Sequence, residues 1–376
     1  MGCGLLCDDV TVETSGDDVR LRPECRLGAR WFAERTRLTG KPPATINGEP
    51  AEVGAALARA AELLRSARRP AVSGFEGATV EDARAAVALA DRIGALVSHG
   101  SLDGPWAGAP AVPLRGSSTA TLGEIRDRSR VVVIWREDPE RTHPRLLGRL
   151  GFGGPGERTL VVVDERETAT AARAGLRLTW SRERDLVALS ALHALQRGLT
   201  IRLDELASEL SGLLERLATV HHVTFVYGAG LTAGPGGQRR ALALHELVRS
   251  LCQERHAVTL ELPAAPGTRS ADDVLAWQTG YAGSVDFASG HPELVMATEP
   301  LDEVDVTLRV ESGGSGGGLV AGPDAEVWIR TAAAGVSAEG TAHRLDGVPL
   351  ALQAPQADSA PTAAALLARL LERVQG

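Results

Sequence analysis

The chain has 376 residues, 44% of them hydrophobic and 23% charged, which is the ordinary balance of a globular protein. Its formal charge of −8 and its pI near 5.7 argue against a nucleic-acid surface, which needs clustered basic side chains. No apolar run reaches the roughly 20 residues of a membrane-spanning helix, and the start lacks the layout of a signal peptide. We therefore expect a cytoplasmic protein of two or three domains that binds neither nucleic acid nor membrane.

Three of the four cysteines, Cys3, Cys7 and Cys25, lie in the first 25 residues. A [4Fe-4S] cluster is held by four thiolates, so this spacing indicates an incomplete cluster site. A fourth ligand three residues before Cys3 would complete the set, but the sequence begins at Met1. Two alternatives stay open: a zinc site that includes a histidine, and a metal-free remnant in which the cysteines are small buried hydrophobes.

The next elements follow in chain order. Alternating residues around a turn near residue 16 predict a hairpin within the first 47 residues. From residue 51 on, apolar residues at helical spacing alternate with unbroken apolar runs, which predicts parallel strands joined by crossover helices. The region from 264 to about 300 is expected to be rich in loops. The predicted strands are 71–75, 131–135, 160–163, 176–180, 223–227, 258–262, 304–310 and 327–329, and the predicted helices include 51–67, 80–93, 183–197, 204–218 and 361–375.

Polar residues that follow these strands are the candidate binding residues, because ligands of open parallel sheets bind at the carboxyl ends of strands. Asp164, Arg166 and Thr168 follow one strand and could meet a guanine or ribose and a phosphate. The alternative is an ordinary helix N-terminus capped by Asp164 or Thr168. Gly228 and Gly230 follow another strand and have the form of half a phosphate-binding turn, although any tight strand-to-helix turn needs glycine.

Ser98 and His99 end a further predicted strand. Neighbouring residues of a strand point to opposite faces, so a serine nucleophile activated by the adjacent histidine is not expected.

These motifs occur together along nearly the whole chain. The most specific is the block Ala338-Glu339-Gly340-Thr341-Ala342-His343-Arg344-Leu345-Asp346-Gly347-Val348-Pro349. The other stretches are 3–9, 25–28, 98–100, 143–145, 163–168, 228–230 and 277–287. In this order they resemble the B subunit of formylmethanofuran dehydrogenase, a family of the molybdopterin oxidoreductases.

The resemblance implies an α/β fold with two doubly wound parallel-sheet lobes of the molybdopterin-oxidoreductase type and a small N-terminal cap. The cap would be 1–47, the first lobe 48–97 with 266–376, and the second lobe 98–265. In the family, the N-terminal cysteines hold a [4Fe-4S] cluster, a cysteine before the position of His99 binds molybdenum or tungsten, and two pterin guanine dinucleotides lie between the lobes. Asp164, Arg166 and Thr168 match a pterin-dinucleotide motif.

The chain departs from this pattern where the redox chemistry takes place. The first cluster cysteine is absent from the sequence as given, either because the ligand is lost or because the true start lies further upstream. Ser98 stands at the metal-ligand cysteine, and Arg136-Glu137-Asp138-Pro139 replaces a small Gly-Cys-Asn-Pro turn. The bulky Arg136 should crowd a pyrophosphate that glycine would admit. These losses favour a chain without cofactor, like the B subunit of the bacterial formyltransferase/hydrolase complex.

That complex moves a formyl group from tetrahydromethanopterin to a methanofuran-type carrier and hydrolyses it to formate. This chain would then be a redox-silent scaffold among formyltransferase, zinc hydrolase and pterin-capping subunits. The alternative is an active molybdenum or tungsten dehydrogenase subunit with Ser98 as metal ligand. A pterin or nucleotide kept near Asp164 as a structural ligand is a third possibility.

Overall fold

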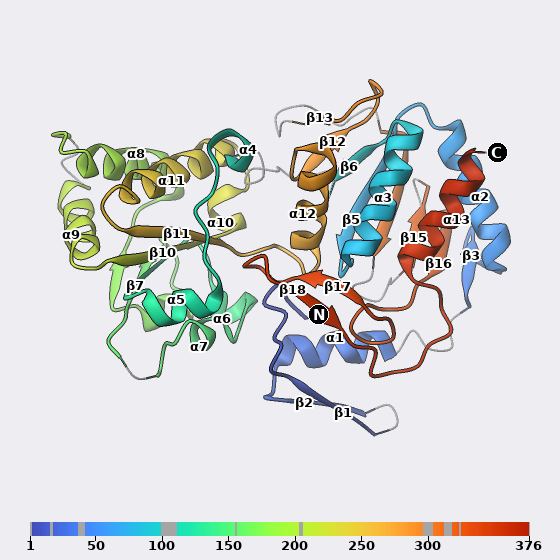
Figure 1. Ribbon diagram of the computed structural model, residues 1–376, viewed down its shortest axis with the longest axis horizontal. Helices are drawn as coiled ribbons and strands as arrows, with labels where there is room; N and C mark the ends of the chain where they lie inside the picture. The colour runs from blue at the N-terminus through green and yellow to red at the C-terminus, as the bar shows by residue number, and fades with distance from the viewer. Residues whose placement is uncertain are drawn as a thin grey trace. The chain divides into compact units, whose positions relative to one another are not determined.

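The computed structural model describes residues 2–15, 18–36, 42–98, 111–154, 156–202, 206–295, 304–311, 318–322 and 325–375. Its contacts divide the chain into two compact units (Figure 1). Unit 1 consists of Met1–Gly104 together with Ala265–Gly376, and unit 2 is Pro105–Ala264. Unit 1 is therefore built from both ends of the chain, and unit 2 from its middle.

Unit 2 contains a five-stranded sheet in the order β11-β10-β7-β8-β9, and every pairing in it is parallel. Its strands are β7 Val131–Trp135, β8 Thr159–Val163, β9 Leu176–Leu178, β10 His222–Tyr227 and β11 His256–Glu261. The chain proceeds outward from β7 in one direction through β8 and β9, and then crosses to β10 and β11 on the other side. The carboxyl ends of β7, β8 and β10 thus meet at the point where the strand order reverses, where doubly wound sheets bind ligands.

Helices cover both faces of this sheet (Figure 1). On one face α8 (Asp185–Gln196), α9 (Ala207–Ala218) and α11 (Gly237–Leu251) share a buried apolar core with side chains of β7, β8 and β10. On the opposite side lie α5, α6 and α7. The shorter helices are α4 Ala111–Arg115, α5 Leu122–Arg128, α6 Pro139–Thr142, α7 Leu146–Arg149 and α10 Ala229–Thr232, with 3₁₀ turns at Ala171–Arg173 and Arg182–Arg184.

Unit 1 contains a nine-stranded mixed sheet in the order β13-β12-β6-β5-β14-β15-β16-β3-β4. Only the central strands β6, β5 and β14 are parallel, and antiparallel strands extend the sheet on both sides. The strands are β3 Ala44–Ile46, β4 Glu49–Ala51, β5 Pro70–Glu76, β6 Leu96–Ser98, β12 Ser284–Asp286, β13 Glu293–Leu294, β14 Val306–Glu311, β15 Gly318–Ala321 and β16 Val327–Arg330.

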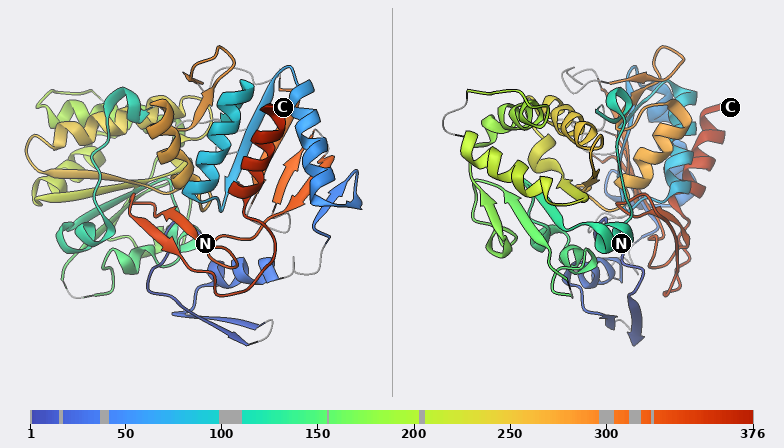
Figure 2. Two further views of the ribbon diagram at one scale, coloured as in Figure 1. Left: turned by 45° about the vertical axis from the view of Figure 1, so that its right-hand side comes forward. Right: turned by 60° about the vertical axis from the view of Figure 1, so that its left-hand side comes forward.

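Four helices lie side by side along this sheet: α2 Val53–Ser66, α3 Val80–Ile93, α12 Thr268–Thr279 and α13 Ala363–Gln375 (Figures 1 and 2). The helix α12 corrects the expectation of a loop-rich region after residue 264. Its buried face consists of Ala271, Val274 and Leu275 together with the small polar Thr268 and Ser270, so its apolar stripe is short and hard to detect in the sequence.

The N-terminal segment forms the expected hairpin, β1 Thr11–Ser15 with β2 Asp18–Arg22. An additional helix, α1 Arg26–Thr36, follows it and buries Trp31 and Phe32 in a small core with Leu21. A second hairpin, β17 Gly340–His343 with β18 Pro349–Leu352, comes from the block at 338–349. That block, the most specific part of the family resemblance, therefore folds as a local unit.

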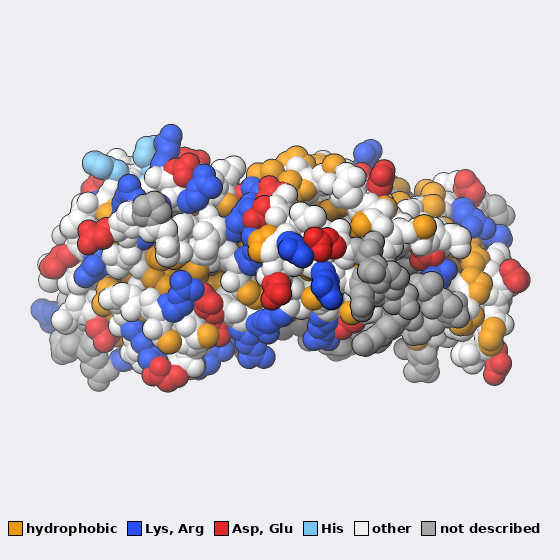
Figure 3. Space-filling view, turned by 90° about the horizontal axis from the view of Figure 1, so that it is seen from below, with side chains coloured by type: hydrophobic (Ala, Val, Ile, Leu, Met, Phe, Trp, Pro, Cys, Tyr) orange, Lys and Arg blue, Asp and Glu red, His pale blue; other side chains and the backbone are white. Residues whose placement is uncertain are grey.

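The surface carries both signs of charge. Arginine and acidic side chains are interspersed on the face seen from below (Figure 3). None of the described helices is long and apolar enough to cross a membrane.

Candidate functional site

The glycine turn after β10 is filled by a carboxyl group of the same chain. The backbone N–H of Gly230 donates a hydrogen bond to Oε1 of Glu137 at 2.7 Å. A Cβ atom on Gly228 would lie 2.7 Å from that oxygen and 2.8 Å from the carbonyl oxygen of Leu262, so the turn requires glycine here for lack of space. Burial raises the pKa of Glu137 to about 7, against the opposing effects of the Gly230 N–H and Arg166.

Arg136, which directly follows β7, fixes the position of this carboxyl group. Its φ of +58° is in the left-handed region that favours glycine, and a Cβ atom on Gly230 would meet its carbonyl oxygen at 1.7 Å. Its buried guanidinium points away from the turn to Asp185, with Nε donating to Oδ2 and Nη2 to Oδ1, both at 2.9 Å. Nη2 also donates to the carbonyl oxygen of Trp180, which gives Arg136 a defined rotamer.

The residues after β8 are bound to one another. Asp164 is fully buried and accepts hydrogen bonds from the backbone N–H and the Nε of Arg166, and its second oxygen accepts from Nη2 at 2.8 Å. These contacts lower the pKa of Asp164 although burial acts in the opposite direction. Thr168 accepts a hydrogen bond from the backbone N–H of Ala171, which begins a 3₁₀ turn whose N-cap residue is Thr170.

The five predicted cofactor-binding residues follow β8 (Asp164, Arg166 and Thr168) and β10 (Gly228 and Gly230) of unit 2. The polar groups described above are bound to other groups of the chain. A pyrophosphate would need the Gly230 N–H that Glu137 occupies and space at the carbonyl of Arg136. The side chains as they stand therefore do not fit a pterin dinucleotide at this turn. Their role in cofactor binding stays a prediction.

Ser98, the residue at the predicted metal-ligand position, is the last residue of β6 and is fully buried. Its Oγ accepts a hydrogen bond from Oγ of Ser284, its partner across the antiparallel β6–β12 pair, at 3.3 Å. His99 lies outside the described residues. The hydroxyl of Ser98 thus has a partner within its own sheet, and the predicted role of the pair in metal binding is untested.

The three N-terminal cysteines form no disulfide with one another. Burial raises the pKa of Cys3 to about 11, and charge on Cys7 and Cys25 acts in the same direction. In the part of the chain that the structure describes, no group of three or more His, Cys, Asp or Glu side chains could hold a metal ion. The three cysteines remain a predicted, incomplete ligand set.

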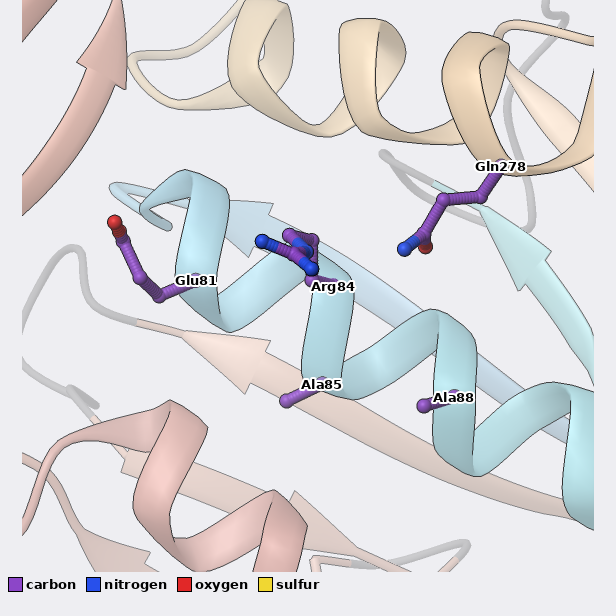
Figure 4. A pocket seen from close by; sticks show the side chains of 5 residues that line it. All are labelled: Glu81, Arg84, Ala85, Ala88 and Gln278. Carbon is purple, nitrogen blue, oxygen red and sulfur yellow. The ribbon is translucent and has the colours of Figure 1, made fainter.

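A second concave region lies in unit 1, where a pocket of about 380 Å³ is lined by α3 and α12 (Figure 4). It has Glu81, Arg84 and Gln278 as its polar side chains. Glu81 is already bound, because its Oε2 accepts the backbone N–H of Thr341 at 2.9 Å. The pocket therefore offers one guanidinium and one amide, without a paired acid and base.

Reasoning from the sequence found the glycine turn but missed Glu137 and Asp185, the two acids that determine its chemistry. In the sequence, Glu137 belongs to the segment that replaces a small turn, and Asp185 belongs to the helix predicted over 183–197. An acidic residue two positions after a buried strand, near the strand end where a ligand would bind, is the signal that could have identified Glu137.

The two α/β units, each of which contains parallel strands, confirm the predicted α/β fold class. None of the protein-family models compared with the chain matches it. Individual relatives do. The chain is 27% identical to the B subunit of the tungsten-containing formylmethanofuran dehydrogenase 2 of Methanocaldococcus jannaschii, over 93% of this chain and 91% of the relative.

The bacterial relative is the B subunit of the formyltransferase/hydrolase complex Fhc of Methylorubrum extorquens, 29% identical over 66% of this chain and 67% of the relative. A chain in the crystal structure of that complex, FhcABCD with methylofuran, superimposes with a TM-score of 0.68 at 25% identity, covering 88% of this chain and 98% of the other. The chain is thus a homologue of the B subunits of formylmethanofuran dehydrogenase and of Fhc, which confirms the resemblance inferred from its motifs.

Proposed function

We propose that the chain is the B subunit of a formyltransferase/hydrolase complex in tetrahydromethanopterin-linked one-carbon metabolism. The observation that carries the proposal is the match to a chain of FhcABCD over 98% of that chain's length. By this proposal the protein is cytoplasmic, and its partners are formyltransferase, zinc hydrolase and pterin-capping subunits.

Within such a complex the chain serves as a redox-silent scaffold. Ser98 supports this role, because its hydroxyl is buried and accepts a hydrogen bond from Ser284, and a hydroxyl is a harder ligand than the thiolate that soft metal sites use. The formyl chemistry then resides in partner subunits, and this chain contributes shape and binding surface.

The second candidate function is an active molybdenum or tungsten dehydrogenase subunit with a [4Fe-4S] cluster. One observation favours it: the tungsten-containing relative aligns over 93% of this chain, more than the 66% covered by the B subunit of Fhc. In that case Ser98 would be a metal ligand and Cys3, Cys7 and Cys25 would ligate the cluster.

Elemental analysis separates the two functions. The native complex is purified anaerobically from its host, and iron, molybdenum, tungsten and zinc are counted per copy of this chain. We expect zinc in proportion to a partner subunit and neither molybdenum nor tungsten. Molybdenum or tungsten near one atom per chain, with about four iron atoms, would instead establish the dehydrogenase.

A further inference from the structure

The Glu137 side chain stands where an external anion would bind the turn between β10 and α10. Its Oε1 accepts the N–H of Gly230 at 2.7 Å and lies so close to Gly228 that a Cβ atom there would be only 2.7 Å away. Any phosphate oxygen that used the Gly230 N–H would have to occupy the space of this carboxyl oxygen. The turn is therefore closed by a group of the chain.

The backbone before Glu137 holds the carboxyl group in place. The N–H of Arg136 donates to the carbonyl oxygen of Val163 at 2.9 Å, and its guanidinium is bound to Asp185 on the other side. The carbonyl of Arg136 also packs directly against Gly230. Glu137 can leave the turn by a change of side-chain rotamer only, because its main chain is fixed at Arg136.

The charged neighbours of Glu137 are also engaged within the chain. Arg166 and Asp164 bind each other, and Asp138 accepts hydrogen bonds from the backbone N–H and the hydroxyl of Thr170. Among these groups, Arg166 favours the charged form of Glu137, while Asp164 and Asp138 oppose it. Burial outweighs the effect of Arg166 and raises the pKa of Glu137 to about 7. Near neutral pH the carboxyl group is therefore charged in some molecules and neutral in others, and Oε1 accepts the hydrogen bond of the Gly230 N–H in either form.

We propose that Glu137 is an internal ligand of the glycine turn, which replaces the external anion and closes the switch point of unit 2 to dinucleotides. The inference does not rest on the proposed function, since it concerns the binding behaviour of this chain alone and its test needs neither partners nor activity.

The test is chemical rescue of the full chain. Glu137→Ala removes the carboxyl group and leaves the Gly230 N–H without its partner, whereas Glu137→Gln keeps an acceptor of the same size. The control Glu167→Ala removes an acid from the nearby loop after β8 whose side chain is 83% exposed. Thermal unfolding is followed by circular dichroism near pH 6.5, in sodium acetate and in sodium chloride of equal ionic strength.

We expect Glu137→Ala to unfold several degrees below wild type in chloride and to regain about 2–4 °C in 100 mM acetate, as a ligand that binds the native state should cause. Wild type, Glu137→Gln and Glu167→Ala should each unfold at the same temperature in both salts. If Glu137→Ala does not fold in chloride, its refolding is measured in both salts, and recovery in acetate alone supports the proposal.

Three results would overturn the proposal. Acetate could stabilise wild type as much as Glu137→Ala, Glu137→Ala could show no response to acetate whatever its unfolding temperature in chloride, or its refolding could fail in both salts. A calorimetric titration of wild type with guanosine diphosphate gives an independent check. No binding at millimolar concentration is expected, and measurable binding to the wild-type turn would contradict the closed switch point.

Discussion

Arg136 combines two properties that rarely occur together: a left-handed backbone and a buried charge. Its φ is +58°, a conformation that costs a residue with a side chain roughly 1–2 kcal/mol. The compensating contact is the bidentate pair with Asp185, in which both side chains are almost fully buried. The strained backbone persists because the surrounding contacts hold Arg136 in this conformation.

Substitution of Arg136 separates these contributions. Arg136→Ala leaves the Asp185 carboxylate buried without its partner, which should lower the free energy of unfolding by about 3–5 kcal/mol. Arg136→Gly loses the same ion pair but removes the backbone strain, so it should be more stable than Arg136→Ala by about 1 kcal/mol. Urea unfolding measures both values.

The matched control is Arg126→Ala, which breaks an ion pair with Asp127 whose side chains are 56% and 65% exposed. It should cost less than about 1 kcal/mol. Equal losses for Arg136→Ala and Arg126→Ala would mean that the buried pair does not stabilise unit 2.

Glu137 should also give the protein a characteristic dependence of stability on pH. Its pKa is about 7 in the folded chain against an ordinary value of 4.5, so between these values the native state holds more protons than the unfolded state. The free energy of unfolding should therefore fall as the pH rises from about 5 to about 8. In Glu137→Gln this decline should be weaker, because the amide does not titrate.

Urea unfolding of both proteins at several pH values checks this. His143 changes stability in the opposite direction, since burial lowers its pKa to about 4 and stability is lost as the pH falls below about 6.5. Both proteins contain His143, so the difference between their pH profiles isolates Glu137. Parallel profiles would show that Glu137 titrates normally.

The β17–β18 hairpin is the element that connects several parts of unit 1. The N–H of Thr341 donates to Glu81 at the start of α3, and the N–H of His343 donates to Oγ of Ser270 on α12. The hairpin loop reaches the N-terminal segment as well, because the N–H of Leu345 donates to the carbonyl of Gly4. The motif at 338–349 thus connects α3, α12 and the N-terminal segment. This structural role explains the length of the motif better than a catalytic role would.

Gly340, the first residue of this hairpin, should not tolerate a side chain. A Cβ atom there would lie 2.7 Å from Cγ2 of Thr79, and Thr79 caps α3 through a reciprocal pair of hydrogen bonds with Asp82. Gly340→Ala should therefore destabilise unit 1 by about 1–3 kcal/mol, measured by urea unfolding.

The control for this steric argument is Gly54→Ala in α2, where the added atom has nothing within 4 Å. Alanine favours the helix, so this change should be neutral or stabilising by up to about 1 kcal/mol. A loss of stability in Gly54→Ala similar to that in Gly340→Ala would contradict the steric explanation.

The elements differ in how well the sequence predicts them, for a physical reason. Buried parallel strands such as β7 and β8 appear as unbroken apolar runs, and their predicted positions agree with the structure to within one residue. The helices α1 and α12 were not predicted. The first directly follows the cysteine motif, and the buried side of the second includes small and polar residues. A helix that buries only a narrow stripe of side chains shows little apolar periodicity in its sequence.

At the scale of the whole molecule, unit 1 depends on pairing between distant segments. Its central strands β5 and β14 are parallel partners, with Ala71 opposite Thr307, and they come from opposite ends of the chain. The sequence predicts each strand but contains no local signal for their partnership, and the antiparallel edge strands were not foreseen. Pairings of this range also slow folding, because a long loop must close before the contact forms.

The contacts of the candidate site were hard to predict from the sequence for the same reason. The glycines and the acidic motif were predicted because they directly follow strands. Glu137 meets Gly230 across 93 positions of sequence, and Arg136 meets Asp185 across 49. Such contacts depend on how strands are ordered in the sheet, which a single sequence does not specify.

The interlocked pair of Arg136 and Glu137 has a consequence for the history of such a chain. Replacement of Arg136 alone leaves the carboxylate of Asp185 buried and unpaired, and replacement of Glu137 alone leaves the amide of Gly230 without a partner. Each single replacement therefore lowers stability. A chain that changes at this turn would then need compensating changes at several positions together.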